Sequence, residues 1–431
     1  MYDVHVTPTR HFNPELVAAI TGGRGGEESE PARDVVWDSR MVEPGYAFIA
    51  LKGERFDGER FVAEALQKGA AFAISRQELP KSVRVDDTHE ALLKLGAWLR
   101  GGITGPLVAV TGSVGKTSTK EALAAGLGWP ATAGNLNTPP ALLRFFWNLD
   151  PAAPGAVVEL GIDHPGEMDE LVRLTAPNLG VLTAIAPVHL EGLGSLEAVA
   201  REKLRLLETS PLRLAHVSTA AWGLPAGSLT YGFDEKADFS ASDLEIDCQG
   251  TSFRYRGRIL RLPTPGKGAA LAALATLAAA EMLGQNVAAV ADRLQELQPA
   301  PHRLQIRRAG EQLWLDDTYN ASPAALAAAL EVLAACPGRK GVVLGTMREL
   351  GDEAERWHRW AAERVREVAD GALFVGEYAE MMAAGWLEAA ALPDTEAAAG
   401  LLPNWSQGYD AILVKGSRAL ALEKLLEVAG V

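Results

Sequence analysis

The stretch 107–121, LVAVTGSVGKTSTKE, constrains the fold of this chain more than any other stretch does. Its run 108–110 predicts a buried parallel strand, followed by a glycine loop at 112–115 and a helix that begins near Lys116. That order places backbone N–H groups and a helix N-terminus around an anion, with the Lys116 amine reaching terminal phosphates and the Thr117 hydroxyl available to Mg²⁺. An ordinary strand–turn–helix corner is the alternative, and the Gly-Lys-Thr run favours a phosphate site.

The chain is too long to form one compact core. Its 431 residues predict two or three domains, and 48% hydrophobic with 22% charged residues is a globular composition. The net charge of −14 argues against a nucleic-acid surface, because proteins that bind phosphate backbones usually carry the opposite sign. Nucleotides need only a local positive site, so nucleotide binding is compatible with this charge.

Cysteine usage and hydropathy predict a cytoplasmic protein without integral membrane association. The two cysteines, Cys248 and Cys336, lie far apart in sequence without metal-ligand spacing, and we expect two reduced core thiols. The N-terminus lacks a basic region followed by an apolar core, so no secretion signal is expected. The longest apolar run, 269–280, is alanine-rich and too short to span a bilayer, and we expect a packed helix.

Three segments separate by pattern, and we expect domains at 1–100, 101–302 and 303–431. Pro299 and Pro301 mark the second boundary, because periodicity is lost between them. In the last two segments apolar strands alternate with helices, which predicts mostly parallel sheets covered by helices. The strands expected along the chain are 46–51, 71–75, 107–111, 156–160, 179–185, 313–315, 341–344, 372–375 and 411–414.

Polar residues follow several of these strands, at the edge where ligands bind in open parallel sheets. A glutamate and a histidine near Thr117 suit a hard divalent cation completed by water and phosphate oxygens. Lys415 and Arg418 suit a carboxylate or a phosphate. Any one such residue is more often structural, but their shared position indicates a site. The residues are Glu159, His189, Glu191, the run DDTYN at 316–320 and the run KGSR at 415–418.

A lysine lies in the apolar stripe of a predicted helix that Ser195 caps. Lys203 comes four residues after Val199 and four before Leu207, both apolar. It is either a lysine that extends its amine to solvent from the edge of a buried face, or a partly buried amine with a lowered pKa. A neutral amine can add CO₂ and become a carbamate, an oxygen ligand beside a metal. The helical spacing leaves both interpretations open.

Together these motifs resemble the Mur ligases, the ATP-dependent ligases of bacterial cell-wall synthesis, over nearly the whole chain. The resemblance implies a three-domain α/β fold: a central P-loop parallel sheet with helices on both faces, a C-terminal Rossmann-like domain and a smaller N-terminal α/β domain. The segments that carry it are 38–40 (DSR), 48–58 (FIALKGERFDG), 115–121 (GKTSTKE), 134–137 (GNLN), 159–161 (ELG), 189–192 (HLEG), 317–321 (DTYNA), 349–351 (ELG) and 415–418 (KGSR).

By this resemblance the first domain holds a UDP-sugar, the central domain holds ATP and Mg²⁺, and the third closes over both. The Leu-Lys-Gly run at 51–53 and the Asp-x-Tyr-Asn run at 317–320 favour the member that joins D-alanyl-D-alanine to UDP-N-acetylmuramoyl-tripeptide through an acyl phosphate. Such a protein is expected to act as a monomer. The alternatives are the preceding ligase of the pathway, a folylpolyglutamate synthase, or a nucleotide-binding regulatory paralogue. The last could dispense with Glu159, His189 and Lys203, which are all present.

The resemblance also implies roles for individual residues. Lys116, His189 and Lys203 are the expected catalytic residues. The metal ligands are expected to be Thr117, Glu159, His189 and carbamylated Lys203. ATP is expected to bind at Thr111, Gly112, Ser113, Gly115, Lys116, Thr117, Ser118, Asn137, Arg303 and Asp317. The other substrates are expected at Ser39, Arg40, Lys52, Phe56, Asp57, Tyr319, Asn320, Lys415 and Ser417.

One segment departs from the family pattern. Where the family has a histidine and two asparagines, the last of which contacts adenine, this chain has PGKGAALA at 265–272. Adenine is therefore expected to be held differently or more weakly. Val114, Ser322 and Thr346 also replace the usual asparagine, asparagine and aspartate. These changes leave the phosphate and metal groups intact.

Overall fold

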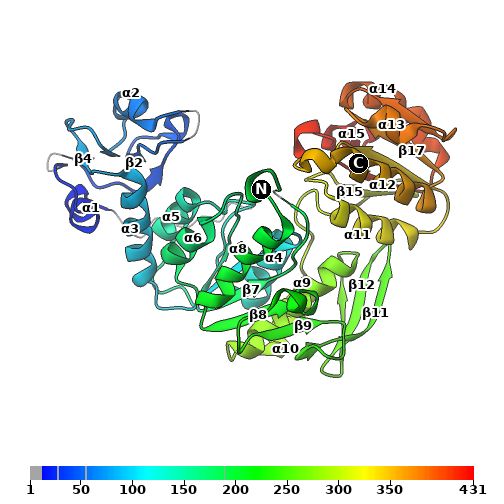
Figure 1. Cartoon of the computed structure of the whole chain (residues 1–431), viewed down its shortest axis with the longest axis horizontal. Coiled ribbons are helices and arrows are strands. Elements are labelled where there is room, and N and C mark those ends of the chain that lie inside the picture. The colour runs from blue at the N-terminus through cyan, green and yellow to red at the C-terminus, as the bar shows by residue number, and fades with distance from the viewer. Residues whose placement is uncertain (1–11, 27–28, 54–55, 189) are drawn as a thin grey trace.

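Three α/β units follow one another along the chain. The computed structural model describes residues 12–26, 29–53, 56–188 and 190–431, with the backbone alone at 190–191. Figure 1 shows the N-terminal unit in blue at one end, the C-terminal unit in orange and red at the other, and the central unit between them. The expected three-domain α/β fold is confirmed, whereas the boundaries at 100 and 302 stay predictions.

The N-terminal unit is a small parallel sheet in the order β1-β2-β3-β4. Its strands are almost entirely buried because helices and neighbouring elements cover both faces. The strands are β1 (Asp34–Val36), β2 (Tyr46–Ile49), β3 (Phe72–Ser75) and β4 (Ser82–Arg84), and the helices are α1 (Pro14–Thr21) and α2 (Val62–Gln67).

The central unit is a six-stranded, all-parallel sheet in the order β10-β9-β8-β7-β5-β6. Chain order reverses beside β5, since β6 lies on one side of it and β7 on the other. Ligands bind at such a switch point in open α/β sheets. The strands are β5 (Leu107–Thr111), β6 (Ala156–Glu159), β7 (Leu179–Leu182), β8 (Leu212–His216), β9 (Leu229–Gly232) and β10 (Phe239–Ser240).

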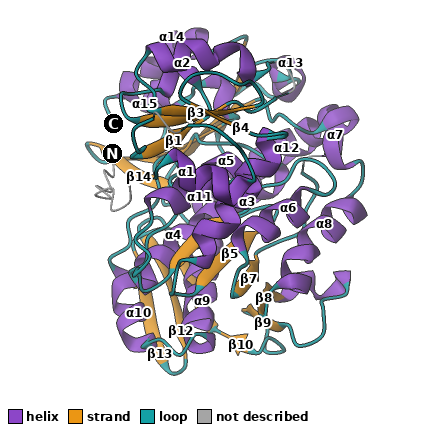
Figure 2. Ribbon diagram, turned by 90° about the vertical axis from the view of Figure 1, so that its left-hand side faces the viewer, coloured by secondary structure: helices purple, strands orange, loops and turns teal. Residues whose placement is uncertain are grey.

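Helices cover both faces of this sheet (Figure 2). Successive side chains of β5 enter different apolar clusters: Leu107 and Ala109 pack with one group of helices, and Val108 and Val110 with the other. On the first face lie α3 (Thr88–Gly101), α5 (Pro139–Asn148), α6 (Glu167–Thr175) and α8 (Leu196–Thr209), and on the second α4 (Lys116–Leu127), α9 (Lys267–Met282) and α10 (Val287–Gln295). The short helix α7 is Leu190–Leu193. The packed helix expected at 269–280 is confirmed as part of α9.

A three-stranded antiparallel sheet in the central unit was not predicted. It consists of β11 (Ser242–Asp247), β12 (Gly250–Tyr255) and β13 (Arg258–Leu262). These strands are half exposed, with buried and open residues in alternation, so they lack the continuous apolar runs that identify the parallel strands.

The C-terminal unit is a six-stranded sheet in the order β14-β15-β19-β16-β17-β18, parallel except for the edge strand β14. Its strands are β14 (Gln305–Ala309), β15 (Gln312–Asp317), β16 (Lys340–Gly345), β17 (Gly371–Val375), β18 (Ala389–Leu392) and β19 (Ala411–Lys415). The helices α11 (Pro323–Ala334), α12 (Ala354–Val368) and α13 (Ala379–Ala383) pack on one face, and α14 (Thr395–Trp405) and α15 (Glu423–Ala429) on the other.

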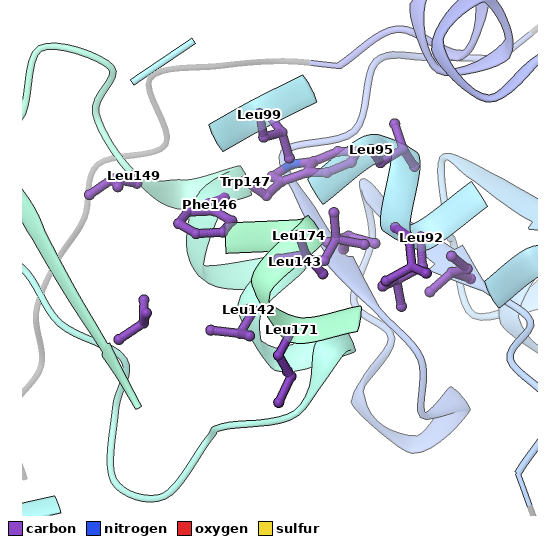
Figure 3. Close-up of a cluster of buried hydrophobic side chains, with 14 of the residues drawn as sticks. Leu92, Leu95, Leu99, Leu142, Leu143, Phe146, Trp147, Leu149, Leu171 and Leu174 are labelled. Atoms are coloured by element: carbon purple, nitrogen blue, oxygen red, sulfur yellow. The ribbon is translucent and has the colours of Figure 1, made fainter. Parts of the chain in front are cut away.

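The N-terminal and central units share one apolar cluster. Figure 3 shows Leu92, Leu95 and Leu99 of α3 beside Phe146 and Trp147 of α5, and this cluster continues into β2 and β3. The C-terminal unit has its own two clusters, and the central hairpin β11–β12 touches one of them through Ile246 and Cys248. Within the described part of the chain, no helix is long and apolar enough to cross a bilayer.

Candidate active site

The glycine loop joins β5 to α4 in the conformation that an anion site requires. Gly112 has φ +152°, and a Cβ there would lie 1.9 Å from the Thr183 hydroxyl oxygen, so a side chain does not fit. Gly115 caps α4 with φ +83° and leaves the first N–H groups of the helix directed into the loop. The sequence-based prediction of strand, loop and helix is confirmed here, including the start at Lys116.

The loop is held by hydrogen bonds to the segment that leaves β7. Ser113 N donates to Ala184 O over 2.8 Å, and the Ser113 hydroxyl oxygen and Ala186 N are 2.9 Å apart. Thr183 donates its hydroxyl to Val114 O over 2.6 Å. Because these partners come from a neighbouring strand, the loop is shaped before any ligand binds.

The side chain of Lys116 folds back over the glycine loop that precedes this residue. Its Nζ donates to Gly112 O over 2.7 Å, and burial lowers its pKa, partly offset by the Glu159 carboxylate. An ammonium folded over its own loop can exchange this carbonyl for a phosphate oxygen, which is a stronger, charge-assisted partner.

Thr117 and Glu159 form a buried pair beneath the loop. The Thr117 hydroxyl donates to Glu159 Oε2 over 2.7 Å, and Asn137 Nδ2 donates to Oε1 over 3.0 Å. Glu159 is 2% exposed at the end of β6, where its partners are neutral groups and its carboxylate charge is available to a cation. Oxygen donors of this kind suit Mg²⁺ completed by water and phosphate.

Of the two other expected metal ligands, His189 and Lys203, the structure describes only Lys203. His189 lies outside the described residues. Among the described residues no three His, Cys, Asp or Glu side chains gather closely enough to hold a metal ion by themselves. A metal at Thr117 and Glu159 therefore needs further donors, from His189, a modified side chain, water or substrate.

Lys203 is fully buried on α8. Its Nζ has no hydrogen-bond partner among the described residues, and burial, with the Lys116 charge second, holds its pKa well below the usual value. The structure therefore favours the buried amine over a lysine that reaches solvent. A lowered pKa favours the neutral amine, which is the form that reacts with CO₂, so the chemistry of carbamate formation fits this position.

Arg303 brings a cation from the C-terminal unit to the loop. Its Nη2 donates to the Thr117 hydroxyl oxygen over 3.1 Å, and its guanidinium carbon lies 4.1 Å from the Tyr319 ring centroid. The flanking residues His302 and Leu304 both have positive φ, +61° and +48°. This backbone is costly for residues with a Cβ, and it turns Arg303 towards the site.

The buried carboxylate of Asp316 holds this turn in place. It accepts from His302 Nδ1 over 2.9 Å and from the Thr318 hydroxyl over 2.8 Å, and it pairs with Arg307 over 2.9 Å. Asp316 is completely buried, so the three partners replace the water that it loses.

Two expected substrate-binding residues act on their neighbours instead of lining the site. Lys415 is buried, pairs with Asp317 and donates to Asn320 O over 2.9 Å. The Ser417 hydroxyl oxygen accepts from Arg348 N over 2.9 Å. Lys415 therefore positions the loop that carries Asp317 and Asn320, and Ser417 positions the loop that carries Arg348.

A cavity of about 490 Å³ joins these groups across three units. It includes Glu349 of the 349–351 motif, to which the sequence analysis gave no role, and three carboxylates that sequence reasoning missed, namely Asp163, Glu167 and Glu170. Asp163 and Glu167 lie just beyond the end of β6, and this position was the available signal. The lining includes His89, Ser113, Val114, Gly115, Lys116, Thr117, Asn135, Asn137, Glu159, Asp163, Glu167, Arg303, Asp317, Tyr319, Asn320, Ser322 and Glu349.

The remaining ATP-site residues lie behind this surface. Thr111 is buried and donates to Leu160 O over 3.0 Å, and Ser118 lies within the first turn of α4.

The segment 265–272, where the family contacts adenine, begins α9. A Cβ at Gly268 would meet no described atom within 4 Å, so open space replaces the missing side chains.

The substrate residues expected in the first unit lie apart from the cavity. Arg40 pairs with Asp38 over 2.6 Å, and this arginine lowers the pKa of Asp38 to about 2. Asp57 pairs with Arg76 over 2.8 Å, and Phe56 is 68% exposed. Ser39 and Lys52 also lie in this unit and do not line the cavity.

Comparison with known proteins agrees with this geometry. Family models match at 33–97 ("Mur ligase family, catalytic domain"), 110–280 ("Mur ligase middle domain") and 302–418 ("Mur ligase, glutamate ligase domain"). The UDP-N-acetylmuramoyl-tripeptide–D-alanyl-D-alanine ligase of Escherichia coli K12 is 36% identical over 418 residues, 91% of this chain and 92% of its own.

Solved structures resemble the whole chain. MurF from Acinetobacter baumannii has a TM-score of 0.89 at 29% identity, covering 97% of this chain and 99% of its own. MurF from Thermotoga maritima, solved in complex with ADP, has a TM-score of 0.80 at 30% identity, covering 92% of this chain and 96% of its own.

Proposed function

This chain belongs to the Mur ligase family, and we propose that it joins D-alanyl-D-alanine to UDP-N-acetylmuramoyl-tripeptide, converting ATP to ADP and phosphate. The observation that carries the proposal is the single cavity in which the phosphate loop faces Arg303 and Tyr319 of the C-terminal unit. The Escherichia coli relative bears the name of this activity, and the Thermotoga structure holds ADP.

In the first step the tripeptide's terminal carboxylate attacks the γ-phosphorus of ATP. An O–P bond forms, the bond to the β-phosphate oxygen breaks, and ADP leaves as an acyl phosphate is produced. Lys116 and the N–H groups at the start of α4 hold the phosphates, and Arg303 adds positive charge from the opposite wall. Catalysis of this step is mainly positioning and charge neutralisation.

In the second step the amine of D-alanyl-D-alanine attacks the acyl carbon. The amine arrives as an ammonium ion and loses one proton to solvent before it attacks. A C–N bond then forms, phosphate leaves with the C–O electron pair, and the departing phosphate takes up the second proton that the nitrogen loses. The carboxylates Asp163, Glu167 and Glu349 line the cavity in which this amine would arrive as a cation. Because water would hydrolyse the acyl phosphate, the C-terminal unit must exclude it by closing over the cavity.

The donors at the site suit Mg²⁺. The Thr117 hydroxyl and the Glu159 carboxylate would hold the ion, with a carbamate on Lys203 and the imidazole of His189 as further ligands. Bound there, Mg²⁺ would supply positive charge to the phosphate oxygens.

The surface around Ser39, Arg40, Lys52, Phe56 and Asp57 is our proposed site for the UDP-sugar. These residues do not line the cavity, which suits a long substrate whose peptide end reaches the phosphate loop while its sugar end is bound by the N-terminal unit. We further propose that the protein acts as a cytoplasmic monomer.

The test is ADP release in the presence of Mg²⁺, UDP-N-acetylmuramoyl-tripeptide and D-alanyl-D-alanine, with the pentapeptide product identified by mass. Both substrates are expected to be required. The proposal would be ruled out if ADP were released at the same rate when either substrate is omitted and no pentapeptide product were formed.

Two matched variants and a substrate panel complete the test. Lys116→Met should abolish turnover, and Lys236→Met, at an exposed lysine beyond β9, should not. Turnover with a shorter UDP-peptide and a different acceptor amine would instead assign the chain to another ligase of the family.

A further inference from the structure

The two cysteines of this chain meet across two structural units. Cys248 lies in the turn between β11 and β12 of the central unit, and Cys336 follows α11 of the C-terminal unit. They are 88 positions apart, and the sequence predicted two separate core thiols. In the structure Cys248 packs against the apolar cluster that contains Cys336, and the two thiols are near enough for Cys248 to raise the pKa of Cys336.

Both ends of this contact are held rigidly. The Asp247 carboxylate fixes the hairpin turn by accepting from Gln249 N over 2.7 Å and Gly250 N over 2.9 Å. Cys336 is 3% exposed, and its thiol donates to Val332 O over 3.4 Å. A disulfide needs two cysteines held close together, and here the fold brings Cys248 against the apolar cluster of Cys336 without a local sequence motif.

We propose that Cys248 and Cys336 are a redox modification site, at which a low-molecular-weight disulfide converts the two thiols into a disulfide between the central and C-terminal units. The Cys248 thiolate attacks one sulfur of the small disulfide, which forms a mixed disulfide and releases one small thiol. The Cys336 thiol then loses its proton and attacks the Cys248 sulfur, releasing the second small thiol. Two protein thiols are oxidised, and one small disulfide is reduced to two thiols.

The environment sets the order of these steps. Burial and the neighbouring Cys248 raise the pKa of Cys336 to about 12, so its thiolate is scarce at neutral pH. Cys248 is only partly buried and is accessible to a small reagent. Cys248 is therefore the first nucleophile, and attack by Cys336 is the slow step.

The bond would restrain the helix that borders the cavity. α11 begins with Ser322 as its cap, beside the phosphate loop, and Cys336 lies two residues beyond its other end. Linking that end to the β11–β12 hairpin, which lies next to α11 in Figure 1, would hinder rotation of the C-terminal unit over the central unit. The expected loss of turnover rests on the proposed function, whereas the cross-link does not.

The experiment incubates the full chain with oxidised glutathione and then measures free thiols and the masses of proteolytic peptides. Loss of both thiols and a peptide pair joined through Cys248 and Cys336 are expected, with full reversal by dithiothreitol. Two retained thiols, or glutathione on Cys248 without a cross-link, would overturn the proposal. These readouts need no enzymatic activity.

ADP release is measured on the same samples. The oxidised chain should turn over severalfold more slowly, and dithiothreitol should restore its rate. Cys248→Ser and Cys336→Ala should each turn over like the reduced chain and stay insensitive to oxidised glutathione. The inference that the disulfide restrains the C-terminal unit would be overturned by a cross-linked chain whose rate of ADP release is unchanged. It would also be overturned by a Cys248→Ser variant that oxidised glutathione still inhibits.

Discussion

Lys203 and Lys120 are both completely buried lysines, but their amines have different surroundings. Lys120 donates to Thr132 O over 2.5 Å and to Gly134 O over 2.7 Å, whereas Lys203 has no partner among the described residues. A buried polar group without a partner costs about 1–3 kcal/mol. Conversion of Lys203 to a carbamate would replace an unpaired amine by an anion beside Lys116, whose charge already acts on it.

Lys203→Ala is therefore expected to lower kcat by about 10²-fold, the usual effect of removing one charge-stabilising group. Short carboxylic acids should restore part of the rate, because they supply the missing oxygens. Rates with and without added acetate or propionate measure this. Lys120→Ala is the control, and it should lose stability without rescue. Normal activity of Lys203→Ala would remove Lys203 from the mechanism.

The adenine region predicts weak base selectivity. Gly268 faces open space, and Lys267 is exposed where the family has polar side chains that contact the base. A site without base-specific hydrogen bonds discriminates between analogues by about 10-fold or less, compared with 10⁴-fold where such bonds are built in. We expect ATP and GTP to differ by no more than this in kcat/KM. A preference of several thousandfold for ATP would contradict this expectation.

At the scale of elements, the connection between α10 and β14 decides whether Arg303 reaches the phosphate loop. Its two positive-φ residues are stabilised from β15, because Asp316 binds the His302 imidazole and Asp317 accepts from Leu304 N over 3.2 Å. A strained backbone of this kind persists only where its surroundings determine it.

Asp316→Asn is expected to raise KM for ATP and to cost about 3–5 kcal/mol of stability, the usual effect of breaking a buried ion pair. Steady-state kinetics and urea unfolding measure the two effects. Asp34→Asn is the matched control, because Asp34 is a buried carboxylate that pairs with Arg144 over 2.5 Å, and neither residue lines the cavity. It should lose stability and keep its KM. Equal changes in KM for ATP in Asp316→Asn and Asp34→Asn would contradict the inference that the connection between α10 and β14 positions Arg303.

His216, at the end of β8, makes the free energy of unfolding depend on pH. Burial, with the charge of Lys267 second, lowers the pKa of His216 from 6.5 to about 4. The unfolded chain then binds the extra proton first, so stability falls as the pH drops from 6.5 towards 4, by at most about 3 kcal/mol. Urea unfolding between pH 7 and pH 4 should show this slope, and His216→Gln should reduce it. An identical slope in the variant would assign the effect to other groups.

At the scale of the whole molecule, the distribution of the apolar clusters defines which parts move together. The cluster in Figure 3 joins the N-terminal unit to the central unit, whereas the described residues of the C-terminal unit pack mainly among themselves. The C-terminal unit can therefore change its orientation at little cost in buried apolar area, as closure over the cavity requires.

Thermal unfolding should separate into two transitions for this reason. Leu95→Ala in α3 should lower only the transition of the joined N-terminal and central units, and Leu413→Ala in β19 only that of the C-terminal unit. Each costs about 2–5 kcal/mol and shifts its transition by several degrees. Differential scanning calorimetry measures both. One transition that moves equally in the two variants would contradict this division.

Local patterns in the sequence were sufficient for nine of the parallel strands, the phosphate loop and Glu159, because each depends on a short run of residues. The parallel strands β1, β4, β8, β9, β10 and β18 were not expected. The expected strands are confirmed to within about two residues at their ends, except that 179–185 ends at Leu182. The hairpin β11–β12 was missed because half-exposed strands lack a continuous apolar run.

The sequence by itself determined the phosphate loop, nine of the strands with their polar ends, and the family. Only the tertiary structure decided that Arg303 contacts Thr117 from 186 positions away, that the amine of Lys203 is sealed from solvent, and that Cys248 meets Cys336. Helices and strands follow from the periodicity of neighbouring residues, whereas these contacts depend on how separately folded sheets are oriented, which no local pattern encodes.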